Sequence, residues 1–259
     1  MTPAVKLLNY LLTSLLFFLP SPALAESYGS WGYNTEWYGR DDMHFSQPGL
    51  GNDFTLHDVR AHDYPGWNSR LLQRGFTVPQ YNIRFGYFFQ PGASWGVEFN
   101  FDHAKHIVTY DQAVHRTGRL NGAPVDDTVR LTADVLRYRL NNGANFLFLD
   151  LVRRVPLLGA APHAGSVALL LKAGAGIMVP HTENSVLNVP NKPGFQFGGF
   201  GGGLETAIRY VPYGPVYFEF AQKGAFTAYR QVHINAGHAR QAFLTYELIF
   251  SMGVMLGAG

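Results

Sequence analysis

The end of the chain shows a strict alternation of apolar and mixed positions. From Leu244 to Leu256 every second residue is apolar, and the residues between them include Glu247 and Ser251. Successive side chains of a β-strand point to opposite faces, so this pattern predicts a strand with one apolar face. The run is far longer than the ~5–6 residues of an average soluble strand. It fits a strand of ~10 residues that crosses a bilayer.

Similar alternation recurs upstream, separated by connections of alternating length. Eight strands are predicted, the first over Asp53 to His62 and the others within 82–89, 97–102, 147–152, 169–179, 203–210, 216–223 and 242–256. Short turns rich in Pro and Gly at 90–93 and 211–214 alternate with long polar segments at 61–80, 103–145, 180–194 and 230–240. This is the pattern of an outer-membrane barrel. The predicted fold is an all-β, membrane-spanning antiparallel up-and-down β-barrel of eight strands, with short periplasmic turns and long outer loops.

Two segments leave alternatives open. Val129 to Leu140 is either a ninth strand or an extension of the fourth strand beyond the membrane. An even strand number, which brings both ends of the barrel to the short-turn side, favours the extension. The aromatic-rich segment 26–52, which includes Trp31 and Trp37, is either a periplasmic lead, an amphipathic piece at the membrane surface, or a plug.

The first residues have the features of a secretory signal peptide. Lys6 precedes an apolar run from Leu7 to Leu19, and Ala23-Leu24-Ala25 is a small-x-small cleavage pattern. The run is shorter than the ~20 apolar residues that a membrane anchor requires. The predicted organisation is therefore a signal peptide over 1–25, a lead segment over 26–52 and the barrel domain over 53–259.

Composition narrows the class of protein further. Only 15% of the residues are charged, against ~25% in soluble proteins, whereas 15% are aromatic and 29 are glycine. There is no cysteine, which excludes disulfides and thiolate metal sites. The formal net charge of +2 gives no reason to expect a nucleic-acid partner. After the signal peptide no apolar run is long enough for a membrane helix, so a chain that spans a bilayer must close into a barrel.

The inward positions of the predicted strands carry six acids and four bases. A buried charge is costly unless it is paired, and the interior of an eight-stranded barrel is only just wide enough for its side chains. We therefore expect a plugged interior with structural ion pairs, and a selective pore is the alternative. The expected lumen charge network is Arg84, Glu98, Asp102, Asp150, Lys172, Glu205, Arg209, Glu219, Lys223 and Glu247. An aromatic girdle at the periplasmic rim is expected from Phe89, Trp95, Tyr210 and Tyr213.

The chain resembles the superfamily of small eight-stranded outer-membrane β-barrels, which contains the OmpA transmembrane domain and OmpW. The resemblance rests on the signal peptide, the eight alternating segments, the short and long connections, and stretches such as 145–149 and 172–176. It implies a place in the outer membrane of a Gram-negative envelope, contact with outer-membrane lipids and lipopolysaccharide, and insertion by the barrel-assembly machinery. One departure concerns that machinery: such barrels commonly end in an aromatic residue, whereas here Phe250 is the nearest aromatic to the end.

Catalytic and metal chemistry find little support in the sequence. His233 and Asn235, followed by Glu247, look like the His-x-Ser and Glu arrangement of PagL-type lipid A deacylases. Asn235 stands where the nucleophilic serine is required, and an amide cannot form the acyl intermediate. We therefore expect no enzyme activity, no catalytic residues, no metal site and no cofactor. The glycine-rich stretch 198–203 leads into a strand, so it indicates room for bulky lumen neighbours rather than a phosphate loop.

The sequence thus favours a structural or interaction scaffold that presents outer loops, of which 103–145 is the largest. Transport of a small or hydrophobic solute, as the OmpW resemblance implies, is the alternative, and modification of lipid A is a third possibility. Neither a ligand nor an oligomeric state follows from the sequence.

Overall fold

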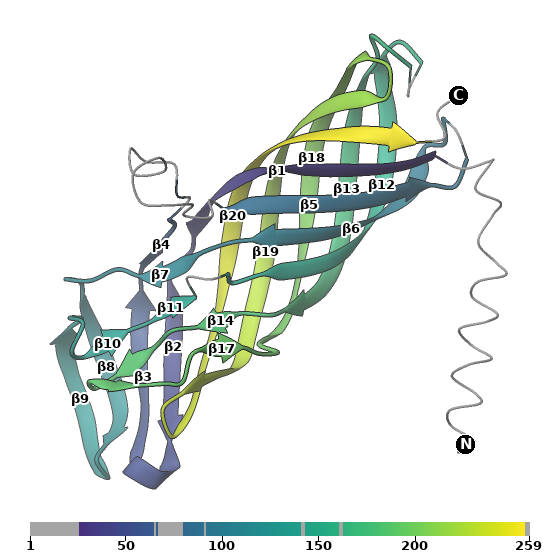
Figure 1. The fold of residues 1–259 in the computed structure, drawn as a ribbon. Helices are drawn as coiled ribbons and strands as arrows, with labels where there is room; N and C mark the ends of the chain where they lie inside the picture. Colours follow the sequence, from purple (N-terminus) through teal and green to yellow (C-terminus); the bar gives the residue numbers. More distant parts are fainter. Residues whose placement is uncertain are drawn as a thin grey trace, which may run out of the picture.

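The computed structural model describes residues 26–64, 66, 80–90, 92–140, 143–160 and 163–256. Eight of its strands form one closed antiparallel ring in chain order, and the last strand pairs back onto the first (Figure 1). The predicted eight-stranded up-and-down barrel is therefore confirmed. The ring consists of β1 (Glu26–Tyr38), β5 (Tyr81–Phe88), β6 (Trp95–His103), β12 (Phe146–Leu158), β13 (Val167–Met178), β18 (Gly199–Tyr213), β19 (Val216–Ile234) and β20 (Gly237–Leu256).

The first strand of the ring is not the one predicted. β1 lies within the segment that was expected to precede the barrel, and it pairs with β20 from Ser27↔Leu256 to Tyr38↔Thr245. The predicted first strand instead forms β3 (Asn52–Val59) and β4 (Ala61–His62), which lie outside the ring. The prediction was wrong because the aromatic residues of β1 obscured its period of two. The expected signal peptide, residues 1–25, lies outside the described residues.

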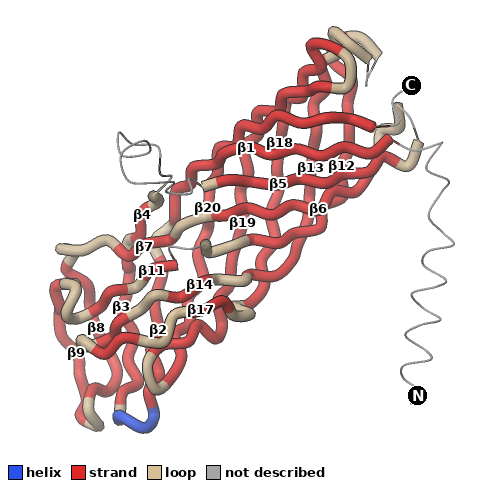
Figure 2. The backbone as a smooth tube through the Cα atoms, viewed as in Figure 1, coloured by secondary structure: helices blue, strands red, loops and turns tan. Residues whose placement is uncertain are grey.

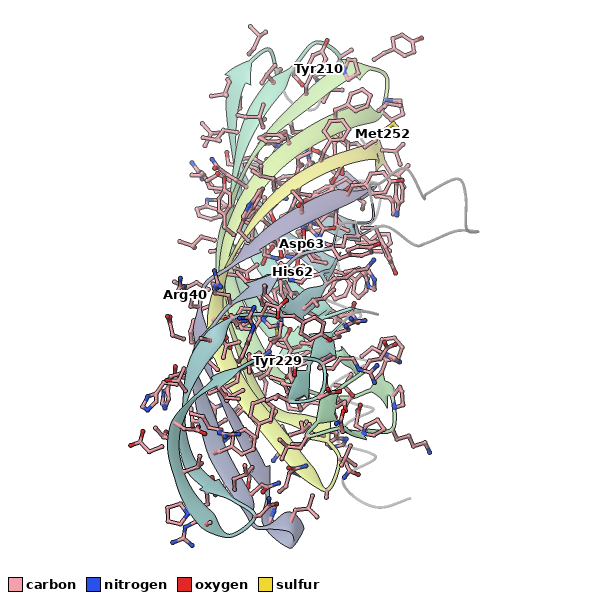
Figure 3. All side chains as sticks on the ribbon, turned by 90° about the vertical axis from the view of Figure 1, so that its left-hand side faces the viewer. Arg40, His62, Asp63, Tyr210, Tyr229 and Met252 are labelled. Carbon is pink, nitrogen blue, oxygen red and sulfur yellow. The ribbon has the colours of Figure 1, made fainter. Side chains whose placement is uncertain are left out.

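Side chains of the ring alternate between an apolar exterior and a polar interior. On β20 the outward residues from Leu244 to Leu256 are largely exposed, whereas Glu247 and Ser251 between them are buried. The same division holds around the ring, and Figure 3 shows side chains projecting outward along its length, with Tyr210 and Met252 toward the short-turn end. A closed ring with an apolar exterior is the surface that lipid requires. Among the described residues, no helix has the length and apolar content needed to cross a bilayer.

The connections follow the predicted asymmetry, with one exception. At one end the turns are short, and at the other the chain forms long excursions rich in further strands (Figure 2). The exception is 230–240, which was expected to be a loop. Here β19 and β20 continue as a hairpin and meet in a tight turn at Asn235 and Ala236.

Beyond the ring, β20 supports an extension sheet. β2 (Asp41–Gln47) pairs with β20 and is followed by β3, β8 (Ala113–Leu120) and β9 (Ala123–Arg130). Short strands also form in the other excursions: β7 (His106–Val108), β10 (Leu136–Arg137), β11 (Arg139–Leu140), β14 (His181–Thr182), β15 (Ser185–Val186), β16 (Val189–Pro190) and β17 (Gly194–Phe195). A 3-10 turn, η2 (Pro48–Leu50), joins β2 to β3. We call these strands together with the extension sheet the outer cap. Val129–Leu140 lies within it and is neither a ninth ring strand nor a continuation of β12.

Two apolar clusters lie at the two ends of the lumen. The cluster at the short-turn end includes Tyr28, Phe88, Leu170, Tyr217 and Met255. The larger cluster fills the outer cap and continues into the mouth of the ring, through residues such as Met43, Phe45, Tyr138, Phe146 and Phe243. The charged residues in the middle of the lumen therefore lie between the two clusters, whereas Arg209 packs within the cluster at the short-turn end, against Tyr28 and Tyr217.

Glycines facing the lumen make room for large neighbours. A Cβ at Gly86 would lie only 1.9 Å from Cζ of Tyr28, so the Tyr28 ring occupies the space where a side chain would be. In the stretch 198–203, a Cβ at Gly201 would lie 3.1 Å from the Phe148 ring. This agrees with the prediction that these glycines accommodate bulky lumen side chains.

We predict that Gly86→Ala destabilises the barrel by about 1–3 kcal/mol, because the methyl group overlaps a buried tyrosine ring. The free energy of unfolding in detergent and urea measures this effect. Gly224→Ala is the matched control, because a Cβ there meets no atom within 4 Å. Equal stability of the two variants would contradict the close packing of Tyr28 against Gly86.

Candidate functional site

All ten ionisable residues expected in the lumen are buried in the structure. Each has at most 5% of its surface exposed. Charges at this depth are stable only when other groups compensate them. Their contacts therefore determine how the lumen is filled.

Lys172 is the hub of the charge network. Its Nζ lies 2.9 Å from Oε1 of Glu98, 2.8 Å from Oε1 of Glu205 and 2.7 Å from Oε1 of Glu219. The hydroxyl group of Tyr28 donates a hydrogen bond to Glu98, one of these three carboxylates (2.7 Å). One cation thus links carboxylates from three other strands across the lumen.

Asp102 joins two further bases. It accepts hydrogen bonds from Arg84 and Lys223, which come from strands on different sides of the ring. Arg84 also approaches Glu98 and Glu205, at 3.5 Å each. Asp150 has an amide partner, Asn100, which donates to it. The network therefore bridges the lumen at several levels.

Aromatic rings complete the environment of the cations. The Arg209 guanidinium lies 4.0 Å from the centre of the Tyr28 ring and 4.2 Å from that of Tyr217, and it bonds to Glu219 (2.8 Å). Lys223 lies 4.5 Å from the Phe148 ring. Desolvated cations over aromatic faces gain up to ~2 kcal/mol. Ring and ion-pair contacts together fill the cross-section.

One buried ion pair was missed in the sequence. Glu26, at the start of β1, accepts two hydrogen bonds from Arg154 (2.6 and 2.9 Å) near the short-turn end. Glu26 was assigned to the lead segment 26–52, and Arg154 was placed beyond the end of the predicted strand 147–152, in a connection of the barrel domain. The alternation of β12 from Leu149 to Arg154 carries a signal that could have placed Arg154 inside.

Cross-strand register explains why opposite charges meet. Along one level of the wall, Lys172 stands opposite Glu205, Glu205 opposite Lys223, and Lys223 opposite Glu247. Directly opposed unlike charges stabilise neighbouring strands, and like charges destabilise them. The sequence gives each strand its inward charge, and the register brings these charges into adjacent positions.

The row of charges that face one another across neighbouring strands ends in two acids. Glu247 is opposite Glu36 of β1, and both are fully buried. Glu36 accepts hydrogen bonds from Asn34, Gln80 and Tyr38. No hydrogen-bond partner of Glu247 is found among the described residues, since Lys223 turns to Asp102 instead. Glu247 is therefore inside as expected, but it is not joined to the ion-pair network.

The four residues of the expected girdle are exposed at the short-turn end. Phe89 follows β5, Trp95 begins β6, and Tyr210 and Tyr213 lie at the end of β18. The Arg153 guanidinium lies 4.8 Å from the Trp95 ring. This places an aromatic and cationic rim where an interface is expected.

The residues of the deacylase-like pattern are not brought together. Asn235 lies in the turn at the far tip of the β19–β20 hairpin, where its carbonyl accepts a hydrogen bond from Gln47 (2.6 Å). His233 is exposed near that tip, whereas Glu247 is buried in the ring ~30 Å further along the strand. His233 and Glu247 therefore cannot act on one substrate atom.

Asp41 and His106 are buried ionisable groups of the outer cap. Burial, reinforced by the charge of Asp42, raises the pKa of Asp41 to about 7. Burial lowers the pKa of His106 to about 3, since its ring is stacked 4.6 Å from Phe243 and lies 4.8 Å from Tyr38. At neutral pH the His106 ring is therefore uncharged, and near pH 7 Asp41 holds its proton about half the time.

Loss of the Lys172 charge should destabilise the barrel strongly. We predict that Lys172→Met lowers the free energy of unfolding by about 3–5 kcal/mol, because three buried carboxylates lose their shared cation. Urea unfolding in detergent measures the change. Lys192→Met, at an exposed cap residue, is the matched control and should change stability by less than ~0.5 kcal/mol. A similar small effect of both variants would argue against the Lys172 hub.

The two cap residues should give opposite pH dependences. Asp41 keeps its proton up to pH ~7 when folded but only to ~4 when unfolded, so its contribution lowers stability by up to ~4 kcal/mol as the pH rises through that window. His106 lowers stability as the pH falls from ~6.5 towards ~3. The pH dependence of hydrogen exchange at the β2 and β3 amides measures both effects. The Asp41→Asn variant should lose the decrease in protection as the pH rises from ~4 to ~7. The His106→Phe variant should lose the decrease in protection as the pH falls from ~6.5 to ~3. Unchanged slopes would refute these assignments.

Comparison with known proteins gives similarity in structure only. No protein-family model and no curated protein sequence matches the chain. Among solved structures, the outer membrane protein OprG of Pseudomonas aeruginosa is 12% identical, with 90% of this chain and 97% of that chain covered and a TM-score of 0.42. Neisserial surface protein A is 8% identical (90% and 96% covered, TM-score 0.37). Ail, the attachment invasion locus protein of Yersinia pestis, is 11% identical (90% and 99% covered, TM-score 0.36). All three TM-scores are below 0.5, so the fold of this chain is defined by its own closed ladder of strands.

Proposed function

We propose that this protein is an outer-membrane scaffold whose closed barrel holds a rigid outer cap at the cell surface. The strongest support for this role is the attachment of the cap to the ring. β19 and β20 continue from the membrane ring into the cap, and β2 pairs directly with the extended β20. The cap is therefore part of the same hydrogen-bonded sheet as the ring.

The cap has its own apolar core, which supports a role in presenting a surface. Met43, Phe45 and Val59 are fully buried on one side of the extension sheet, while charged residues such as Asp126 and Arg130 are exposed on β9. A loop without such a core would be mobile. A packed sheet instead holds its exposed side chains at fixed positions, as recognition of a partner requires.

The closed lumen favours a scaffold over transport. Lys172 and Asp102 join residues of opposite walls, and apolar clusters lie above and below them. Passage of a solute would require several buried ion pairs to break together, at a cost of several kcal/mol each. The same contacts support a structural role for the ten lumen residues.

Labelling of introduced cysteines on intact cells tests the location and orientation, because the chain has no cysteine of its own. Thr128→Cys on β9 should react with a membrane-impermeant maleimide. Ala164→Cys, in a short turn at the other end, should react only after the outer membrane is permeabilised. The reverse result, or equal labelling of both, would refute the proposed orientation.

Planar-bilayer recordings test the closed lumen. The intact protein should give no steady channel, because the cross-section is filled by paired charges and aromatic rings. Steady openings of defined conductance would instead favour transport of a small solute, and the scaffold proposal would fail.

A further inference from the structure

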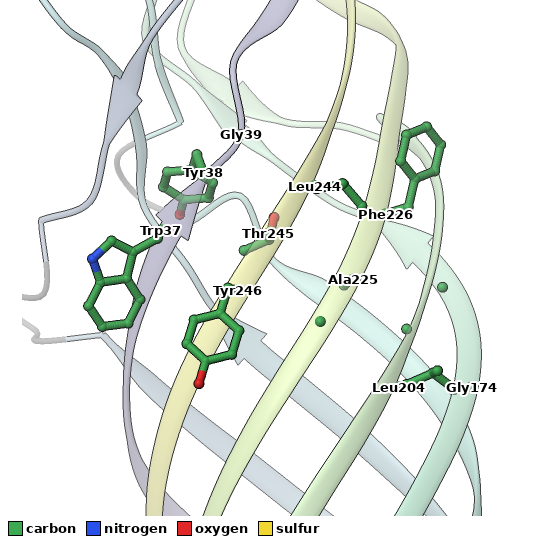
Figure 4. Close-up of a pocket in the computed structure, with 13 residues that line it drawn as sticks. Trp37, Tyr38, Gly39, Gly174, Leu204, Ala225, Phe226, Leu244, Thr245 and Tyr246 are labelled. Atoms are coloured by element: carbon green, nitrogen blue, oxygen red, sulfur yellow. The ribbon is translucent and has the colours of Figure 1, made fainter.

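The membrane face of the ring carries a large apolar groove beside the outer cap. The groove has a volume of about 850 Å³ and is shown in Figure 4. Its walls are Trp37, Phe226, Leu244 and Tyr246, which all face outward from β1, β19 and β20. Gly224 forms part of its floor, where a Cβ would meet no atom within 4 Å. The groove therefore suits flexible apolar chains.

Cationic side chains stand on the same face of the same two strands, further toward the hairpin tip. Arg230 on β19 and Arg240 on β20 are exposed, and Ala228 and Ala242 separate them from the groove. Neither arginine takes part in an ion pair with a described residue, and Asp53 of the neighbouring β3 is engaged by His44 (3.2 Å). The two positive charges are thus not neutralised by the described part of the protein.

The length of the apolar band matches the hydrocarbon thickness of a bilayer. The outward apolar residues of β20 run from Leu256 back to Leu244, which at ~3.3 Å per residue and a ~40° tilt covers about 30 Å of bilayer. Arg240 lies four residues beyond Leu244, about 10 Å above the apolar band by the same geometry. Arg230 stands at a similar distance beyond Phe226. The arginines therefore lie at headgroup height, directly above a groove at acyl-chain height.

We propose that the outer face of β19 and β20 binds one molecule of a phosphorylated glycolipid of the lipid A type. Its acyl chains lie in the groove between Trp37, Phe226 and Leu244, and its phosphates are bound by Arg230 and Arg240. Guanidinium groups bind phosphate by paired hydrogen bonds, and two of them on adjacent strands fit a lipid with two phosphates. The inference rests on the proposed outer-membrane location, since lipids of this kind lie in the outer leaflet.

Charge complementarity favours a lipid over a second copy of the chain. A symmetric partner would place Arg230 and Arg240 near the same residues of another molecule, where like charges repel at headgroup height. A phosphorylated lipid instead supplies the opposite charge and the apolar chains together. A dimer is therefore an outcome that the test must detect.

Native mass spectrometry of the full-length folded protein in detergent micelles, with added diphosphoryl lipid A, tests the proposal. The double variant Arg230→Gln/Arg240→Gln should weaken lipid A binding by at least about ten-fold, because both phosphate contacts are lost. Arg119→Gln/Arg130→Gln is the matched control, since these exposed arginines lie on β8 and β9 away from the groove. It removes the same charge and should leave binding unchanged.

A second pair of variants tests the groove. Gly224→Leu should fill the floor and also weaken binding, whereas Val97→Leu, outward on β6 across the ring, should not. Removal of the lipid phosphates should reduce binding to the unmodified protein as much as the arginine changes do. Equal binding by every variant, equal binding of dephosphorylated lipid A, or a protein dimer in place of lipid would overturn the proposal. Cysteine labelling on cells reports location independently, so failure here is distinguishable from failure of the proposed function.

Discussion

The pairing of β1 with β20 is the constraint on which the rest of the structure depends. Twelve residue pairs, from Ser27↔Leu256 to Tyr38↔Thr245, close the ring and leave no open sheet edge within it. In hydrocarbon an unsatisfied backbone group costs several kcal/mol, so an open sheet could not remain there. Closure also gives every side chain of the ring one of two environments, lipid or lumen. The apolar exterior and the charged interior are both consequences of it.

Closure makes the interior narrow, and a narrow interior makes charge pairing obligatory. Lys172 faces Glu98, Glu205 and Glu219 with almost no solvent to replace any of them. Such a network is weak evidence for high stability, because desolvation offsets most of the attraction. Its effect is on specificity: a slip of one residue in register would turn the charges of a strand towards lipid. The network thus favours one register of the barrel and fills the path that a solute would need.

The unequal strand lengths connect the ring with the outer cap. β19 and β20 continue past the ring, so the cap grows from their shared sheet instead of hanging on flexible loops. The free edge of that sheet is β9, where Pro124 and the charged Asp126 and Asp127 oppose pairing with another strand. The outward face of β19 and β20 passes from the apolar residues of the ring to the exposed Arg230 and Arg240. One pair of strands therefore carries both the attachment of the cap and the proposed lipid site.

The alternating pattern establishes the barrel class, seven of the eight ring strands, and which residues of those seven strands face inward, because a period of two needs only local order to be visible. The ten residues expected in the lumen from this pattern are buried, and the expected girdle residues 89, 95, 210 and 213 are exposed at the short-turn end. Folding of the whole chain decided that Glu26–Tyr38 closes the ring, and that Asp53–His62 belongs to the cap. It also decided that Arg154 pairs with Glu26 and that Glu247 remains outside the ion-pair network. These outcomes depend on long-range register, which brings together residues more than a hundred positions apart and which a local period of two does not report.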